Sequence, residues 1–286
     1  MESKAKKKGS GVVLFSVLSV LFAVLFAAAC IGSQLAFASS QAVNIALHTS
    51  TYATRDTDAD AIYYESDFDS VEALEAHDKE IAEQLTGEGS VLLKNDGALP
   101  LAVGSKVSTL SHSSVDFVTC GTGSADINTS NAPTFKAALE EVGLEVNPTL
   151  WDFYTTGAGK DYARSKSGTV AKSSEVTAEV PWDVYTDEVK DSVAQYGDAA
   201  IVTLSRVGGE GADLSYGEVN YLALDENEKA MLQNVAEMKK NGTVKKTILL
   251  INSANALQVD FLKNNEYDID AALWIGDVGI SGINAV

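Results

Sequence analysis

Cysteine and basic residues are scarce in this chain, and their scarcity excludes two classes of protein. Cysteine occurs only at positions 30 and 120 of the 286 residues, so a small domain held by a disulfide framework is excluded. Lys and Arg number 21 against 40 Asp and Glu, which gives a formal net charge of −19. Because nucleic-acid phosphates are bound by clustered Lys and Arg, this balance argues against a nucleic-acid partner.

Motifs for metals, nucleotides and serine nucleophiles are also lacking. The three histidines lie far apart and no cysteine–histidine metal spacing occurs, so we expect no metal and no cofactor. A Gly-x-Ser-x-Gly elbow, which an α/β-hydrolase esterase needs, is absent. Gly121 to Asp126 is similar to a phosphate-cradling glycine loop, but Asp126 stands where the dinucleotide fingerprint needs a third glycine or an alanine. A nucleotide-binding flavodoxin-like domain is therefore the weakest of the functions considered.

Residues 1–38 have a composition unlike that of the rest. Four lysines stand among residues 4–8, and no charged residue occurs from Gly9 to Gln41. The apolar run is long enough to cross a bilayer as a helix, with the basic head on the cytoplasmic side. Ala36-Phe37-Ala38 fits the small-x-small pattern of signal-peptidase cleavage near Ala38. We expect an exported protein, either anchored in the membrane through residues 11–38 and facing outside, or secreted after cleavage.

The remainder divides into a polar segment and one α/β domain. Residues 39–68 are polar with little helical period, which predicts a linker or extended arm. Residues 69–286 alternate helical and strand-like runs, which is typical of β-α-β units with right-handed crossovers. We therefore predict a doubly wound, mostly parallel sheet, a flavodoxin-like α/β sandwich, preceded by the N-terminal transmembrane or signal helix. The expected helices are 69–86, 133–142, 150–154, 226–240 and 256–263, and the expected strands are 106–110, 144–147, 199–204, 245–251 and 269–275.

Two further segments bear on the extent of the domain. Residues 157–180 are rich in Gly, Ser, Lys and Thr without an apolar period, which predicts an exposed insertion. The last four residues follow a strand and a glycine turn as the start of a new helix. An incomplete helix there would leave apolar surface uncovered, so we expect the domain to be incomplete at its C-terminus, as a truncated gene or a natural remnant.

The segment Ser205 to Ser215, SRVGGEGADLS, is the strongest candidate for chemistry. It follows the strand-like run 199–204 and places Glu210 between glycines. Ligands of open α/β sheets bind outside the carboxyl ends of the strands, and glycines let a ligand approach the backbone closely. Glu210 is therefore a candidate proton donor, and a solvated turn is the alternative interpretation.

Two neighbours of Glu210 are candidate substrate-binding residues. Arg206 could orient Glu210 or contact a hydroxyl of the substrate, or it could pair with Asp213 or Glu218 as a structural bridge. Asp213 could bind the substrate, although capping the turn is its more ordinary role. The tryptophans are further candidates for stacking on a ligand, and Trp182 has a better prospect of exposure than Trp274, which lies in a buried-looking strand.

Several segments in order resemble glycoside hydrolase family 3, the β-glucosidase family. They resemble its C-terminal-type α/β sandwich domain in the members where that domain precedes the catalytic barrel. The segments are EGSVLLKNDGALPL (Glu88 to Leu101), the stretch Thr119 to Tyr154, SRVGGEGADLS, LDENEKAMLQNV (Leu224 to Val235), ILLINSANAL (Ile248 to Leu257) and DAALWIGDVGISGINAV (Asp270 to Val286).

This resemblance implies an exported enzyme that hydrolyses O-glycosidic bonds of a glycoside or oligosaccharide with retention. In the family an aspartate on a (β/α) barrel attacks the anomeric carbon, and Glu210 matches the acid/base position. The chain contains neither the eight strand–helix units of a barrel nor the nucleophile segment, so we expect a barrel downstream in the intact gene and an inactive fragment here. The alternative is a membrane-tethered, non-catalytic carbohydrate-binding or scaffold module, which a stop codon after Val286 would favour.

Overall fold

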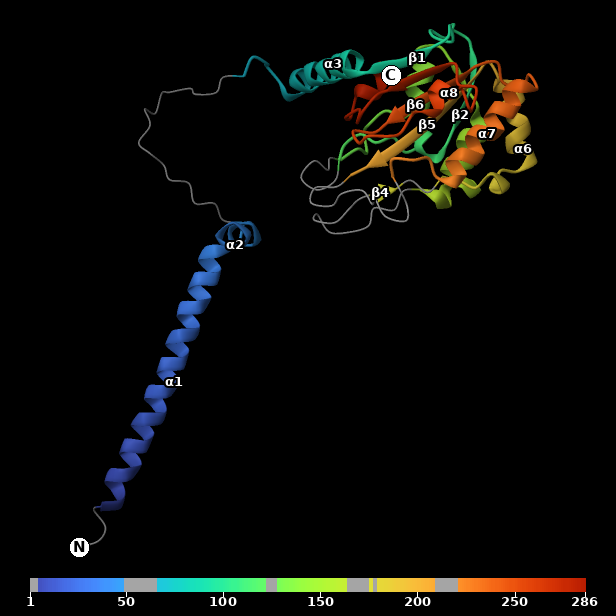
Figure 1. Ribbon diagram of the computed structural model, residues 1–286. Coiled ribbons are helices and arrows are strands. Elements are labelled where there is room, and N and C mark those ends of the chain that lie inside the picture. The colour runs from blue at the N-terminus through green and yellow to red at the C-terminus, as the bar shows by residue number, and fades with distance from the viewer. Residues whose placement is uncertain (1–4, 49–65, 122–127, 164–174, 177–178, 209–220) are drawn as a thin grey trace. The chain divides into compact units, whose positions relative to one another are not determined.

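The structure is a computed structural model that describes residues 5–48, 66–121, 128–163, 175–176, 179–208 and 221–286 (Figure 1). The chain divides into two compact units, Met1–Ser66 and Asp67–Val286. The boundary lies close to the predicted start of the α/β domain at residue 69.

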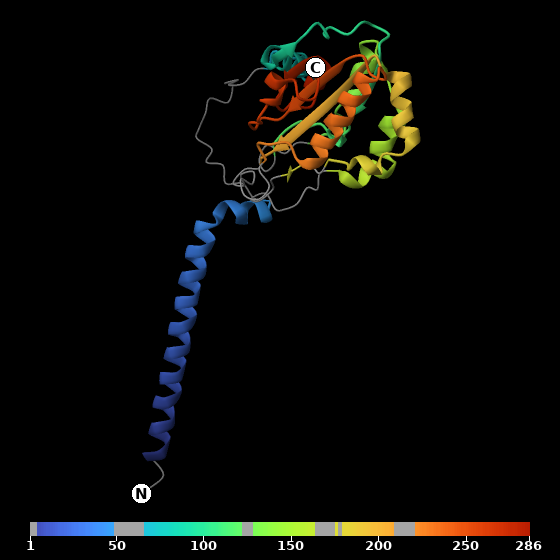
Figure 2. The same ribbon diagram turned by 45° about the vertical axis from the view of Figure 1, so that its right-hand side comes forward.

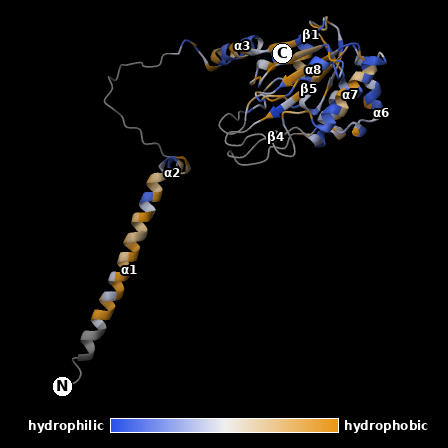
Figure 3. Ribbon diagram, in the orientation of Figure 1, coloured by the Kyte–Doolittle hydropathy of each residue, from blue (hydrophilic) through white to orange (hydrophobic). Residues whose placement is uncertain are grey.

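The first unit consists of α1 (Ala5–Ala38) and α2 (Ser40–Ala46). Within α1, the apolar stretch Gly11–Ala38 has 28 residues and none of its most apolar part is buried. At 1.5 Å per residue this stretch is about 42 Å long, more than the ~30 Å hydrocarbon core of a bilayer. Figure 3 shows its hydrophobic colouring along most of the helix. By length and composition α1 can cross a membrane, a test that signal sequences also pass. The predicted linker is helical over α2 and otherwise lies largely outside the described residues.

The second unit is built on a mixed sheet with the strand order β1-β7-β6-β5-β2-β3. Pairing is parallel from β7 through β6, β5 and β2 to β3, and the edge strand β1 is antiparallel to β7. A short strand β4 (Glu175–Val176) pairs antiparallel with the last residues of β5. The bounds are β1 (Val91–Asn95), β2 (Lys106–Leu110), β3 (Glu145–Val146), β5 (Ala199–Val207), β6 (Thr247–Asn252) and β7 (Ala271–Trp274). The predicted α/β class with a mostly parallel sheet is confirmed.

Apolar side chains cover both faces of the sheet, as the doubly wound prediction requires. All residues of β5 and β6 are buried, which is typical of parallel strands covered on two sides. One core packs the sheet against α5 (Pro148–Thr155), α6 (Asp187–Ser192), α7 (Glu226–Lys240) and α8 (Phe261–Asn264). The other packs it against α4 (Phe135–Glu141) and the 3₁₀ turn η6 (Gly282–Ala285). Further 3₁₀ turns are η1 (His112–Ser114), η3 (Ala158–Tyr162), η4 (Trp182–Val184) and η5 (Val193–Tyr196).

Helix α7 shows clearly how local sequence and packing agree. Asp225 caps its first turn and Glu228 bonds back to the amide of Asp225, which completes a capping box. Met231 and Val235 lie one turn apart and are fully buried against β5 and β6. Figure 2 shows α7 running alongside the long strand β5.

Two predicted helix boundaries are wrong for identifiable reasons. Helix α3 (Val71–Gly89) includes Gly87 and Gly89, which lie beyond the end predicted at residue 86. It packs so closely on η6 that a Cβ on Gly282 would meet Thr86 Oγ1 at 2.1 Å, so tertiary packing overrides the low helix propensity. Helix α8 covers only Phe261–Asn264 of the predicted 256–263. The amide of Asn255 bonds instead to Ser253 Oγ at 3.0 Å, a local turn that competes with helix.

Candidate functional site

The strand order of the sheet reverses between β2 and β5. From β2 the chain goes outward to β3, then returns past β2 to β5 and continues to β6 and β7. Ligands of open α/β sheets bind at such a switch point, outside the carboxyl ends of the strands. The segments that leave β2 at Ser111 and β5 at Gly208 therefore border the candidate site.

The predicted site residues belong to the end of β5 and to the stretch of sequence that follows it. Glu210 and Asp213 belong to residues 209–220, which lie outside the described part of the chain. Arg206 is the second-last residue of β5 and is described in full. It occupies the same face of the strand as Val202 and Leu204, because alternate residues of a strand share a face.

Arg206 is buried and every one of its five N–H groups has an acceptor. Its Nη1 and Nη2 donate to the two carboxylate oxygens of Glu228 at 2.6 and 2.8 Å. The remaining donors reach main-chain carbonyls: Nε that of Tyr221 at 2.8 Å, Nη2 that of Ala223 at 3.0 Å and Nη1 that of Ser205 at 2.8 Å. The guanidinium thus ties the end of β5 to helix α7 and to the residues just before it.

This ion pair is almost completely shielded from solvent, and its partner differs from those expected. The side chains of Arg206 and Glu228 are 3% and 2% exposed. Burial opposes the charged guanidinium, but the hydrogen bonds and charge of Glu228 outweigh it, so the pKa of Arg206 lies above its ordinary value. The partners expected from the sequence, Asp213 and Glu218, both lie outside the described residues. Glu228 was missed because it was assigned only to a helix, although its position three residues after Asp225 is the signal of a capping box.

The beginning of the same segment is tied down by the loop after β6. The amide of Gly208 donates to Asn255 Oδ1 at 3.0 Å, and Ser253 Oγ donates to the carbonyl of Arg206 at 3.0 Å. A Cβ on Gly208 would lie 2.9 Å from Asn255 Nδ2, so this close approach favours glycine. Beyond the segment, the amide of Gln258 donates to the carbonyl of Leu222 at 2.7 Å.

Glu179 is a buried carboxyl beside the end of β2 that the sequence interpretation did not single out. Its Oε1 accepts from the amides of Val180 at 2.8 Å and His112 at 3.4 Å, and its main-chain carbonyl accepts from Asn227 of α7. The prediction that residues 157–180 form an exposed insertion is therefore wrong at its C-terminal end. The apolar neighbours Val180-Pro181-Trp182 were the available signal, because they lead the chain back into the core.

Burial raises the pKa of Glu179 to about 8, against the effect of the hydrogen bonds from Ser111 and Val180. The hydroxyls of Tyr154 and Tyr185 lie in hydrogen-bond contact nearby, and burial raises the pKa of both phenols well above the ordinary value. Glu179 is thus held neutral in the folded protein around neutral pH, as a structural part of this corner of the domain.

Glu179→Gln is expected to remove part of the pH dependence of stability. Between pH 4.5 and 8 the unfolded chain ionises Glu179 while the folded chain keeps it protonated, so its contribution is complete below pH 4.5 and is lost as the pH rises to 8. A glutamine does not titrate. Urea unfolding of the full chain in mild detergent at pH 5, 6, 7 and 8 should therefore give the wild type a steeper decline of the free energy of unfolding than the variant, by ~1 kcal/mol per pH unit. Parallel declines would contradict a neutral buried Glu179.

The candidate tryptophans are engaged in packing. Trp182 is partly buried, stacks near Tyr185 and lies under the ammonium group of Lys190. Trp274 is also partly buried, and its Nε1 donates to the carbonyl of Ser253 at 2.8 Å. Trp274 of β7 therefore supports the loop after β6, whose Asn255 holds the amide of Gly208.

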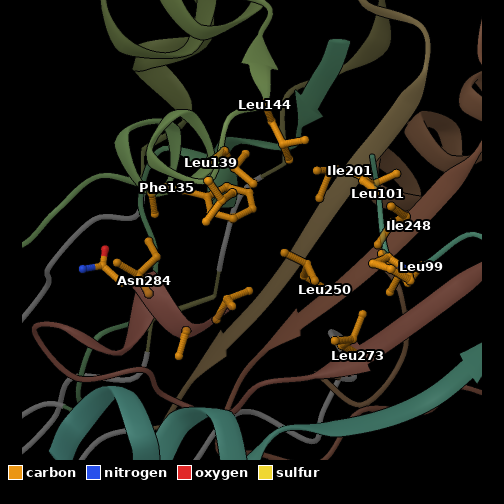
Figure 4. A pocket seen from close by; sticks show the side chains of 16 residues that line it. Leu99, Leu101, Phe135, Leu139, Leu144, Ile201, Ile248, Leu250, Leu273 and Asn284 are labelled. Atoms are coloured by element: carbon orange, nitrogen blue, oxygen red, sulfur yellow. The ribbon is translucent and has the colours of Figure 1, made fainter. Parts of the chain in front are cut away.

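A sizeable pocket lies on the other face of the sheet (Figure 4). Its volume is about 330 Å³ and Asn284 is the polar residue among its mainly apolar lining. A sugar needs hydrogen-bond partners for its hydroxyls, which this wall does not offer. The labelled residues are Leu99, Leu101, Phe135, Leu139, Leu144, Ile201, Ile248, Leu250, Leu273 and Asn284. The pocket belongs to the second core and not to the site at the carboxyl ends of β2 and β5.

Comparison with known proteins identifies the domain. The model of the glycosyl hydrolase family 3 C-terminal domain matches residues 90–286. A β-glucosidase of Ruminococcus albus is 28% identical over 207 residues, which is 71% of this chain and 20% of that protein. The structure of a β-glucosidase from Paenibacillus barengoltzii aligns with a TM-score of 0.62 and 25% identity, over 72% of this chain and 22% of that one. β-Glucosidase 3B from Thermotoga neapolitana in complex with glucose aligns with a TM-score of 0.60 and 24% identity, over 74% and 29%, and supports the fold.

The chain spans about a fifth of the curated relative that it matches. The match nevertheless covers most of the α/β unit and includes β5 and the segment after it. The chain therefore belongs to glycosyl hydrolase family 3 and carries its C-terminal domain.

Proposed function

We propose that this chain supplies the acid/base residue, Glu210, of a retaining glycoside hydrolase of the β-glucosidase type. The observation that carries the proposal is the place where the segment with Glu210 leaves the sheet. It follows directly after β5, at the switch point where α/β sheets bind their ligands. The nucleophile is an aspartate outside this chain, on a barrel domain of the same gene product.

The reaction needs two carboxyl groups about 5–5.5 Å apart across the glycosidic bond. Glu210 first gives its proton to the departing oxygen while the nucleophile forms a bond to the anomeric carbon. The resulting Glu210 carboxylate then takes a proton from water, whose oxygen replaces the nucleophile on the sugar. The product keeps the anomeric configuration of the substrate, because two displacements invert it twice.

The neighbouring carboxyl groups favour Glu210 for this role by elimination. Glu179 is buried and holds the amides of Val180 and His112. Glu228 is buried and holds both terminal nitrogens of Arg206. Neither can reach a glycosidic oxygen without breaking these contacts, which favours an acid from the segment that contains Glu210.

We further propose that the domain works outside the cytoplasm. The apolar helix α1 with its basic N-terminal head supports either a membrane anchor or a signal sequence. In both cases residues 67–286 would meet glycosides or oligosaccharides outside the cytoplasm.

Two preparations test this function together. The complete gene product is expected to hydrolyse aryl β-glucosides and to release the β-anomer first, as followed by proton NMR. The 286-residue chain by itself is expected to give no turnover, since it lacks a nucleophile. Hydrolysis by the isolated chain that vanishes in Glu210→Ala would show that the nucleophile lies within it. Carbohydrate binding without turnover by the complete product would favour a non-catalytic binding module instead.

A further inference from the structure

We propose that Arg206 and Glu228 form a clamp that positions Glu210 by fixing both ends of the segment from Gly208 to Tyr221. This inference rests on the proposed function, because it assigns the clamp to the acid/base step. Arg206 and Glu228 are positioning residues: their groups contact protein, and they act on the reaction through Glu210.

The first support is the set of atoms that the guanidinium selects. Two of its donors reach main-chain carbonyls at the exit of this segment, one of Tyr221, its last residue, and one of Ala223, two residues further on. A third reaches the carbonyl of Ser205, on the strand that leads into that segment. Because arginine presents its donors in a rigid planar fork, these bonds fix the exit of the segment relative to its entrance in orientation as well as distance.

The second support is that the entrance is fixed independently. Asn255 holds the amide of Gly208, and Ser253 holds the carbonyl of Arg206. Glu210 comes two residues after Gly208, a backbone span of at most ~7 Å. A shift of the entrance at Gly208 would therefore reach Glu210 with little chain between to absorb it, and the exit at Tyr221 fixes the far end of the segment.

The third support is that stability alone does not explain a buried ion pair. Removing two charges from water costs so much that replacing a buried pair by apolar side chains of similar size is often neutral or stabilising. In contrast, the geometry of a catalytic group matters strongly, since a displacement of about 1 Å can lower a rate about 100-fold. The clamp joins β5, the exit of the segment and the capping box of α7, so its geometry is set by three elements at once.

The test uses the double variant Arg206→Met with Glu228→Met, which removes both charges and keeps the volume. Arg206→Lys is the second variant, because it keeps the charge and loses the fork. Lys239→Met is the matched control: Lys239 lies on the same helix α7 and pairs with Asp268 and Asp270 at 3.0 and 2.7 Å, but near the other ends of the strands. Each is made in the complete gene product, with and without Glu210→Ala.

Two measurements are made on each variant. The first is hydrogen–deuterium exchange of peptides that cover residues 205–225. We expect exchange there to rise about tenfold or more in the double variant and in Arg206→Lys, because the hydrogen bonds that hold the exit of the segment are lost, and to stay unchanged in Lys239→Met. The second is kcat/KM for aryl β-glucosides with graded leaving groups. We expect losses of about 10–100-fold for poor leaving groups and little loss for dinitrophenyl glucoside.

The background with Glu210→Ala decides whether the clamp works through Glu210. If it does, clamp variants lower the rate no further once Glu210 is gone. Unchanged exchange in both clamp variants, equal losses for all leaving groups, or the same losses in the Glu210→Ala background would each overturn the inference. If exchange rises in the clamp variants but Glu210→Ala leaves the rates unchanged, the proposed function of Glu210 is wrong, and the catalytic role of the clamp is wrong with it.

Discussion

Glu210→Ala in the complete gene product is expected to lower kcat/KM by about 10²–10⁴-fold for glucosides with poor leaving groups. An alcohol departs as a neutral molecule only if a proton reaches its oxygen, and in this account Glu210 is the donor. Dinitrophenolate departs without a proton, so its glucoside should lose far less at the first step. Steady-state kinetics with a series of aryl and alkyl β-glucosides, plotted against the pKa of the leaving group, measures the difference.

The isosteric variant Glu210→Gln controls for packing, because it keeps the shape of the side chain and removes its titration. It should give the same steep leaving-group dependence and should abolish the basic limb of the pH–rate profile, which reports the general acid. A uniform loss across the series would mean that residue 210 supports the structure and does not transfer the proton.

Arg206→Met alone is expected to destabilise the folded chain by about 3–5 kcal/mol. The reason is the carboxylate that stays behind: Glu228 is 2% exposed and would lose the partner of both its oxygens. Adding Glu228→Met should recover most of that loss, because no unpaired charge remains buried. Urea unfolding of the full chain in mild detergent, with the wild type, both single variants and the double variant, gives the coupling energy directly.

Lys239→Met provides the comparison for a less buried pair. The side chains of Lys239 and Asp270 are 15% and 24% exposed, so water can solvate the abandoned carboxylate and the expected loss is smaller. If the losses in free energy of unfolding of the two single clamp variants added up to the loss of the double variant, Arg206 and Glu228 would not be energetically coupled. The burial of the pair would then have another cause.

The central part of the sheet was predictable because local and global signals agree there. The apolar run Ile248–Ile251 has no period that distinguishes two faces, and the structure buries both faces of β6. Helix α7 follows its capping signal at Asp225 and its apolar spacing, and its bounds match the predicted 226–240. Strand β5 goes on to Val207, beyond the predicted Leu204, because β4 pairs with its last residues.

The site was only partly predictable, since its polar partners are distant in sequence. Arg206 and Glu228 are separated by 22 residues, and no periodicity links them. Glu179 stands at the end of a polar stretch whose composition indicates exposure. Only the fold brings its carboxyl group within hydrogen-bond reach of the His112 amide, 67 residues earlier in the chain. Glu210 was found through the glycines around it and through the family resemblance, whose fold and membership the structure and comparisons confirm. Its role as acid/base remains a proposal.

The most direct measurement is the product that Glu210→Ala forms in the presence of azide. The small anion needs no base, so it should attack the glycosyl-enzyme formed from dinitrophenyl β-glucoside, restore turnover and release β-glucosyl azide, which NMR identifies. We expect that product and that rise in rate for the variant, with no gain for the wild type. A variant that gains no rate and forms no glucosyl azide would contradict the assignment of Glu210 as the proton donor.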